Sequence, residues 1–208
     1  TYSHGITTND EQFLVMEFLD GPGLNSLIIG QSKLLDGNRL TLARQAAEAL
    51  EAVHEAGYIH RDICPRNFVC SKDATSLKLI DFGLTVPAEK EFMLPGNRTG
   101  TPNYMAPEVG SGRYGREVDV YAVGIMLYEL LTGSPPFRDG TLVQKLMKHQ
   151  QAEPASLDAF RSDVPTEVQA ILSRLEFGKL WEDRESRCSA PFRTEQQDPC
   201  WTLLHRLA

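Results

Sequence analysis

Cysteine is scarce in this sequence, which limits the kinds of fold and site that it can form. The 208 residues include 4 cysteines, at Cys64, Cys70, Cys188 and Cys200. They lack the paired spacing of structural zinc ligands, and they are too few for a disulfide scaffold in a chain of this length. We therefore expect reduced thiols, as in a cytoplasmic protein.

Basic residues and long apolar runs are also few. The chain has 21 Lys and Arg against 28 Asp and Glu, a formal net charge of −7. This balance offers no basic surface for nucleic acid or anionic lipid. The longest apolar run, Tyr121–Leu131, is too short to cross a bilayer and contains Glu129, so it predicts a buried helix. We expect neither a nucleic-acid partner nor a membrane segment.

What remains is the composition of a globular domain, with 41% hydrophobic and 24% charged residues. Such a chain can bury one sizeable core, and one domain is the default expectation. The first residue is Thr1 rather than Met, and no charged-then-apolar leader follows it. We expect the start of the gene product to lie elsewhere.

Residue patterning in the first half predicts short strands around one helix. The apolar run Phe13–Phe18 follows a polar segment and indicates a strand. From Arg39 to His54 apolar residues recur at helical spacing, and Gly57 closes the pattern. The segments "NFVC" and "LKLI", separated by polar "SKDATS", predict a hairpin.

The second half has helical patterns and few strand signals. The segment 118–131 is apolar around nearly its whole circumference, which predicts a central buried helix. Further helices are expected over Thr141–Gln150, Pro165–Leu175 and Pro199–Leu207, with Pro165 in a first turn. The fold class expected is α+β, mainly helical with short hairpins.

Three polar clusters supply parts of the chemistry that moves a phosphoryl group from ATP to a hydroxyl. That transfer requires an acceptor for the hydroxyl proton, Mg²⁺ on the phosphates and in-line positioning. The clusters are "HRDICPRN" at 60–67, "DFG" at 81–83 and "APE" at 106–108. Their sequences and order resemble those of the eukaryotic-type protein kinases.

The resemblance implies a role for each polar residue. Asp62 would be the catalytic base for the substrate hydroxyl, although a lone loop Asp is more often a turn former. Asn67 and Asp81 would be catalytic residues that bind Mg²⁺, a cation that takes oxygen ligands, and Asp81 would link it to the phosphates of ATP.

Two further segments extend the resemblance. The segment "DVYAVG" matches the start of the family's central helix, where Asp119 would hold the backbone of the catalytic loop. The segment "DRESRCSA" resembles the end of the kinase pattern, with Arg184 where proline is usual. It implies an ion pair between Arg187 and Glu108.

The segment "LVMEFLDG" is similar to the hinge between kinase lobes. The backbone of Glu17 and Leu19 would face adenine, Met16 would be the gatekeeper, and Val69 would close the adenine slot from below.

The implied domain division places the end of the N-lobe sheet and the hinge at 1–19 and the kinase C-lobe at 20–208. The C-lobe would contain the catalytic loop at 60–67, the activation segment at 81–108 and the central helix at 118–131. The glycine-rich loop, the phosphate-binding lysine and the glutamate of the N-lobe should precede Thr1. This chain alone is therefore expected to be inactive.

Some residues depart from the family pattern. Cys64 stands where serine/threonine kinases carry a lysine, and Arg66 resembles the arginine of tyrosine kinases. The segment "GTPNYMAPE", with Thr101, resembles the serine/threonine substrate-binding stretch, so we favour ATP-dependent phosphorylation of serine and threonine in a protein substrate. Tyrosine or dual specificity and a pseudokinase or scaffold remain the alternatives. We expect Cys64 to be structural rather than reactive, and Thr99 to be an autophosphorylation site that pairs with Arg61.

Overall fold

Helix α3 (Glu117–Thr132) forms the centre of the molecule in the computed structural model, which describes residues 1–88, 99–111, 115–161 and 163–175. Every residue from Val118 to Leu131 is buried, as expected for a helix that is apolar on all sides. Gly133, with φ of 87°, ends the helix in the left-handed conformation that glycine adopts without strain. The helix extends one residue beyond the predicted 118–131 at each end.

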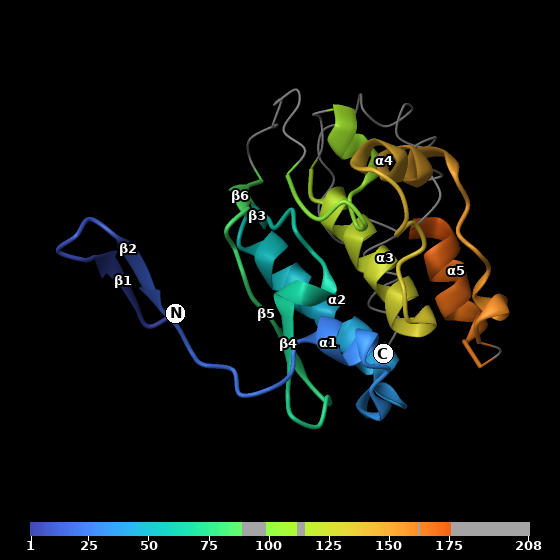
Figure 1. Ribbon diagram of the computed structural model, residues 1–208, viewed down its shortest axis with the longest axis horizontal. Coiled ribbons are helices and arrows are strands. Elements are labelled where there is room, and N and C mark those ends of the chain that lie inside the picture. The colour runs from blue at the N-terminus through green and yellow to red at the C-terminus, as the bar shows by residue number, and fades with distance from the viewer. Residues whose placement is uncertain (89–98, 112–114, 162, 176–208) are drawn as a thin grey trace.

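Helices α2 (Arg39–Glu55), α4 (Leu142–Gln151) and α5 (Thr166–Leu175) surround α3 (Figure 1). The inner face of α2 contributes the buried residues Leu42, Ala43, Ala46, Ala47, Leu50 and His54. Burial of such a face, at about 25 cal/mol per Å² of apolar surface, is the main force that holds the helices together. Short helix α1 (Leu24–Ile29), for which no pattern was identified in the sequence, packs beside β4 (Phe68–Cys70).

The predicted hairpin joins β4 antiparallel to β5 (Leu77–Leu79), with Val69 opposite Lys78. The chain before α1 lies against the other edge of β4, where the Cys70 amide donates to the Pro22 carbonyl at 2.9 Å. A Cβ atom on Gly21 would lie 1.9 Å from the Cys70 carbonyl oxygen, so only glycine fits there.

The ends of α4 and α5 follow from local hydrogen bonding. Thr141 caps α4 by accepting from the Gln144 amide, while the Gln144 side chain bonds the Thr141 amide. Helix α5 begins at Thr166, so the prediction that Pro165 lies in the first turn was wrong; it precedes the helix. The helix expected over Pro199–Leu207 lies outside the described residues.

Strands β1 (Ser3–Ile6) and β2 (Gln12–Val15) form an antiparallel hairpin that stands apart from the helices (Figure 1). The strand predicted over Phe13–Phe18 ends at Val15, because Met16–Phe18 pair with no strand in the part of the chain that the structure describes. Phe13, Leu14 and Val15 are all exposed.

A third pair, β3 (Tyr58–Ile59) with β6 (Val86–Pro87), brings the segment before residue 60 beside the one after residue 83. Four 3₁₀ turns complete the described elements: Lys33–Leu35, Pro65–Asn67, Pro107–Ser111 and Leu157–Ala159. Among the described residues no helix is long and apolar enough to cross a membrane.

Candidate active site

Asp119, in the first turn of α3, fixes the loop that carries the polar cluster at 60–67. Its Oδ2 accepts from the His60 amide at 2.8 Å, and its Oδ1 accepts from the Arg61 amide at 2.8 Å. His54 of α2 lies 2.9 Å from the same Oδ2 through its Nε2. The carboxylate is 1% exposed, and a buried charge with these partners holds the loop to the core.

The two segments that flank the site contain strained backbone. Arg61 and Asp81 have φ of 66° and 63°, in the left-handed region that non-glycine residues rarely adopt. The Arg61 Nε donates to the Leu84 carbonyl at 2.7 Å, which ties the two segments together. Strain of this kind gathers at functional sites, where surrounding contacts hold it.

Asp62 and Asn67, predicted as catalytic residues, lie in contact. The Asn67 Nδ2 donates to the Asp62 main-chain oxygen at 2.7 Å and to its Oδ2 at 3.0 Å. Because the amide nitrogen faces Asp62, the Asn67 Oδ1 remains available as an oxygen ligand.

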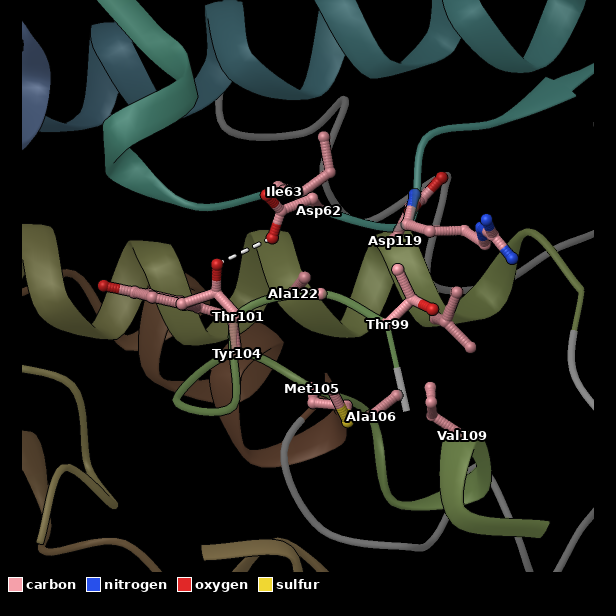
Figure 2. A pocket seen from close by; sticks show the side chains of 13 residues that line it. Asp62, Ile63, Thr99, Thr101, Tyr104, Met105, Ala106, Val109, Asp119 and Ala122 are labelled. Atoms are coloured by element: carbon pink, nitrogen blue, oxygen red, sulfur yellow. Dashed lines mark hydrogen bonds between the residues drawn. The ribbon is translucent and has the colours of Figure 1, made fainter. Parts of the chain in front are cut away.

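Thr101 faces Asp62 from the opposite segment (Figure 2), and its Oγ1 donates to the Asp62 Oδ1 at 2.7 Å. The Arg66 Nη2 donates to the same Oγ1 at 2.9 Å, whereas the Cys64 Sγ lies 3.6 Å from it. Arg66 is exposed, while Cys64 is fully buried. Arg66 therefore places a positive charge beside Thr101 and Asp62, and the burial of Cys64 is consistent with its expected structural role.

Gly100 lets this segment approach the catalytic loop closely. Its φ is 119°, and a Cβ atom there would lie 2.7 Å from the Arg61 carbonyl oxygen. Both the conformation and the space exclude other residues without movement of the backbone. Gly100 therefore helps to set how far Thr101 lies from Asp62.

Asp81, the second predicted metal ligand, lies two residues after the end of β5. The Ile80 amide donates to the Asn67 carbonyl at 2.8 Å, so Asp81 comes one residue after a backbone contact to Asn67. Its carboxylate is exposed, and the Oδ1 accepts from the Gly83 amide at 3.1 Å. An exposed carboxylate and a free amide oxygen are the ligand types that fit Mg²⁺.

Glu17, Leu19 and Val69, predicted at the adenine site, line one hollow between the chain before α1 and the β4–β5 hairpin. The Lys78 Nζ lies 2.7 Å from both Glu17 carboxylate oxygens across this hollow. Met16, predicted as gatekeeper, does not line it and is 54% exposed.

A buried pair anchors the 101–106 segment on α3. The Tyr104 hydroxyl donates to the Glu129 Oε2 at 2.6 Å. Burial raises the pKa of the Glu129 carboxyl, and the hydrogen bond from Tyr104 partly opposes this rise. Burial and the neighbouring Glu129 also raise the pKa of the Tyr104 phenol. The only sign of this pair in the sequence is the acidic residue within an apolar run.

Two predictions at this site have no outcome in the structure. Arg187, the expected partner of Glu108, lies outside the described residues, although Glu108 is 8% exposed and buried as expected. Thr99 and Arg61 line the same small cavity beneath the 99–106 segment (Figure 2), and phosphorylation of Thr99 stays a prediction. His54, which contacts Asp119 from α2, was not identified from the sequence, and neither was His149 of α4.

Comparison with known proteins agrees with this geometry. The protein kinase domain family matches residues 1–197. The chain is 34% identical over 197 residues to the serine/threonine-protein kinase Pkn1 of Myxococcus xanthus, covering 91% of this chain and 28% of that protein. It is also 34% identical over 176 residues to the serine/threonine-protein kinase PAK mbt of Drosophila melanogaster, covering 84% of this chain and 27% of that protein.

A third relative, calcium-dependent protein kinase 8 of Oryza sativa, is 41% identical over 134 residues, which cover 62% of this chain and 24% of that protein. The chain therefore spans between a quarter and a third of the length of the first two relatives, and slightly less of the third. The family match extends over most of the chain and includes every segment that carries the site. The chain belongs to the protein kinase domain family.

Proposed function

We propose that the protein containing this chain is a serine/threonine-protein kinase that transfers the γ-phosphoryl group of ATP to hydroxyl groups of a protein substrate. The observation that supports this most directly is the contact of Thr101 and Asn67 with the two carboxylate oxygens of Asp62. The printed names of two relatives, both serine/threonine-protein kinases, favour the same specificity. The chain would supply the hinge at 1–19 and the C-lobe at 20–208.

Asp62 is the proposed base. Its Oδ1 already accepts a hydroxyl hydrogen from Thr101 at 2.7 Å, so an incoming serine or threonine hydroxyl can be accepted in the same way. The contact with Asn67 keeps Oδ2 oriented. General-base assistance of this kind contributes about 10²–10⁴-fold to the rate.

Asn67 Oδ1 and the Asp81 carboxylate are the proposed Mg²⁺ ligands. A bound Mg²⁺ would neutralise charge on the phosphates of ATP. The residues keep this role available, because Asn67 directs its nitrogen at Asp62 and Asp81 keeps its carboxylate exposed. Glu17, Leu19 and Val69 would bind adenine at the hollow that they line.

Arg66 is proposed to supply the positive charge that lysine would supply at position 64. Its guanidinium reaches Thr101 from the side of the catalytic loop, 2.9 Å from the Oγ1. A planar fork of donors can also hold a phosphate oxygen. This proposal removes one of the two arguments for a pseudokinase, the cysteine at position 64; the other was that the phosphate-binding lysine is not among these residues.

The function is tested with the full-length protein, Mg²⁺ and γ-labelled ATP, followed by phosphoamino-acid analysis of a general protein substrate. We expect label on serine and threonine, and its loss in Asp81→Asn. Label on tyrosine alone would contradict the specificity, and no transfer by the wild-type protein would contradict the function.

The role of Arg66 has its own test in the same assay. Arg66→Met is expected to reduce kcat by about 10-fold or more, since a hydrogen bond to a charged group is worth about 1.5–3 kcal/mol. Adding Cys64→Lys to that variant should restore much of the rate. Arg44→Met, which removes an exposed ion pair with Glu48, is the matched control and should match the wild type.

A further inference from the structure

Helix α4 contacts the substrate-binding stretch from the side opposite the catalytic loop. The Lys145 Nζ donates to the Asn103 Oδ1 at 2.7 Å. Asn103 is two residues from Thr101, whose Oγ1 contacts Asp62. The stretch is therefore held by the catalytic loop at Thr101 and by α4 at Asn103.

His149, one turn further along α4, forms the second link. Its side chain is buried, with 4% of the residue exposed, and its Nδ1 lies 2.7 Å from the Tyr121 hydroxyl of α3. The Phe137 ring packs edge-on against it, with the ring centroids 5.0 Å apart. The imidazole is thus fixed in orientation by groups from α3 and from the chain that follows it.

The ring of His149 lies one turn along α4 from Lys145, which contacts Asn103 of the substrate-binding stretch at 2.7 Å. Burial lowers the pKa of His149 to about 4, and the backbone groups of Pro102 and Asn103 act in the opposite sense. The Nε2 is buried and makes no hydrogen bond of normal length and angle among the described residues. A small shift of the 102–103 backbone would therefore satisfy it.

We propose that Lys145 and His149 are positioning residues for the protein substrate. They act through Asn103 and the 102–103 backbone, which set the position of Thr101 beside Asp62. The inference rests on the proposed kinase function and deepens it. Neither residue touches ATP or the reacting atoms; both set the surface on which the segment around the accepting hydroxyl lies.

In its neutral form, the His149 ring has one nitrogen that accepts a hydrogen bond and one that donates. When the Tyr121 hydroxyl donates to Nδ1, the proton of the imidazole is on Nε2, where it can be donated to a main-chain carbonyl of the stretch. A buried donor without a partner is unfavourable, so the ring favours the arrangement in which the stretch lies close to α4. The buried helix α3 thereby acts on the substrate stretch through Tyr121 and His149.

Lys145 is tested by steady-state kinetics on the full-length protein, with the peptide or protein substrate and ATP varied separately. Lys145→Met should raise KM for the protein substrate by about 5-fold, as expected for loss of one hydrogen bond, with KM for ATP unchanged. The matched control is Lys148→Met, on the same helix, whose Nζ contacts the Asp139 carbonyl at 3.0 Å instead. It should leave both KM values at the wild-type level.

His149 is tested by two amide substitutions that keep different halves of the ring. Glutamine places an amide near the position of Nε2, and asparagine places one near Nδ1. We expect His149→Gln to keep KM for the protein substrate within about 2-fold and His149→Asn to raise it by about 5-fold.

The outcomes separate this inference from the function on which it rests. No transfer of phosphate by the wild-type protein overturns the proposed function. Normal transfer with equal protein-substrate KM values in wild type and Lys145→Met, or with KM for ATP rising equally, overturns the inference alone. A reversed order of the two His149 variants, or loss of thermal stability with no change in KM, would assign His149 a purely structural role.

Discussion

The catalytic loop and the N-terminal hairpin are both short stretches of irregular chain and strand, yet they are held in opposite ways. Asp119 fixes the loop from within the core and is 1% exposed, whereas Leu14 of β2 is 53% exposed. An isolated two-stranded hairpin is marginally stable in water. The comparison indicates that the loop that carries the catalytic residues is stabilised by the rest of this chain, whereas the hairpin is stabilised little by it.

The largest effect should come from removing the buried anchor. Asp119→Ala leaves the His60 and Arg61 amides without their acceptor in the core. We expect the free energy of unfolding of the full-length protein to fall by about 3–5 kcal/mol, measured by chemical denaturation. Asp139→Ala is the control, because its side chain is 84% exposed. Equal effects of the two substitutions would contradict the role assigned to Asp119.

The next largest effect should be on the pH dependence of stability, which depends on the buried imidazole of His149. The pKa of His149 falls from 6.5 to about 4 on folding, so the unfolded chain binds its proton first as pH falls. Its contribution to stability is therefore complete above about pH 6.5 and is lost between there and about pH 4, amounting to about 3 kcal/mol. Unfolding free energies over this range should fall less steeply in His149→Gln; equal slopes in the two proteins would count against the burial of a neutral imidazole.

Gly100 tests the close approach of the two segments. Gly100→Ala meets the Arg61 carbonyl oxygen at 2.7 Å, while Gly37→Ala, also at positive φ (78°), meets no atom of the described residues within 4 Å. Both variants carry the conformational cost, of about 1 kcal/mol, and only the first adds the clash. We expect turnover to fall in Gly100→Ala alone, and comparable turnover in both would show that the approach is not needed.

The smallest effect is expected in the hairpin. Leu14→Ala should change the unfolding free energy of the chain 1–208 by less than about 0.5 kcal/mol, because the side chain is mostly exposed. Leu127→Ala, at a residue that is fully buried in α3, should cost about 2–5 kcal/mol in the same measurement. A large effect at Leu14 would mean that the hairpin is supported by this chain after all.

The sequence was most informative where one local signal decides the outcome. The mostly apolar run at 118–131 predicts an enclosed helix, and residues 60–67 and 81–83 carry side chains whose chemistry is specific in combination. Helix α1 was missed because its six residues form less than two turns. The hairpin strand was predicted three residues too long because the apolar run continues to Phe18 after pairing ends at Val15.

The hold of Asp119 on the catalytic loop was expected from the family resemblance, but other long-range contacts between polar residues could not be predicted, because no local pattern records them. The link from Tyr121 to His149 joins residues 28 apart, and that from Tyr104 to Glu129 joins residues 25 apart. The reach of Arg66 to Thr101 also depends on how two loops meet. The sequence allowed us to suggest a cation at position 66, but the distance that supports the suggestion comes from the fold.

The central claim is that the carboxylate of Asp62 accepts the proton of the substrate hydroxyl. The most direct test is kcat for phosphoryl transfer by full-length Asp62→Asn, with ATP affinity measured in parallel. The account predicts that kcat falls by about 10²–10⁴-fold while ATP binding is retained, since the substitution keeps the shape of the side chain and removes its basicity. An Asp62→Asn protein that transfers phosphate at the wild-type rate would contradict it.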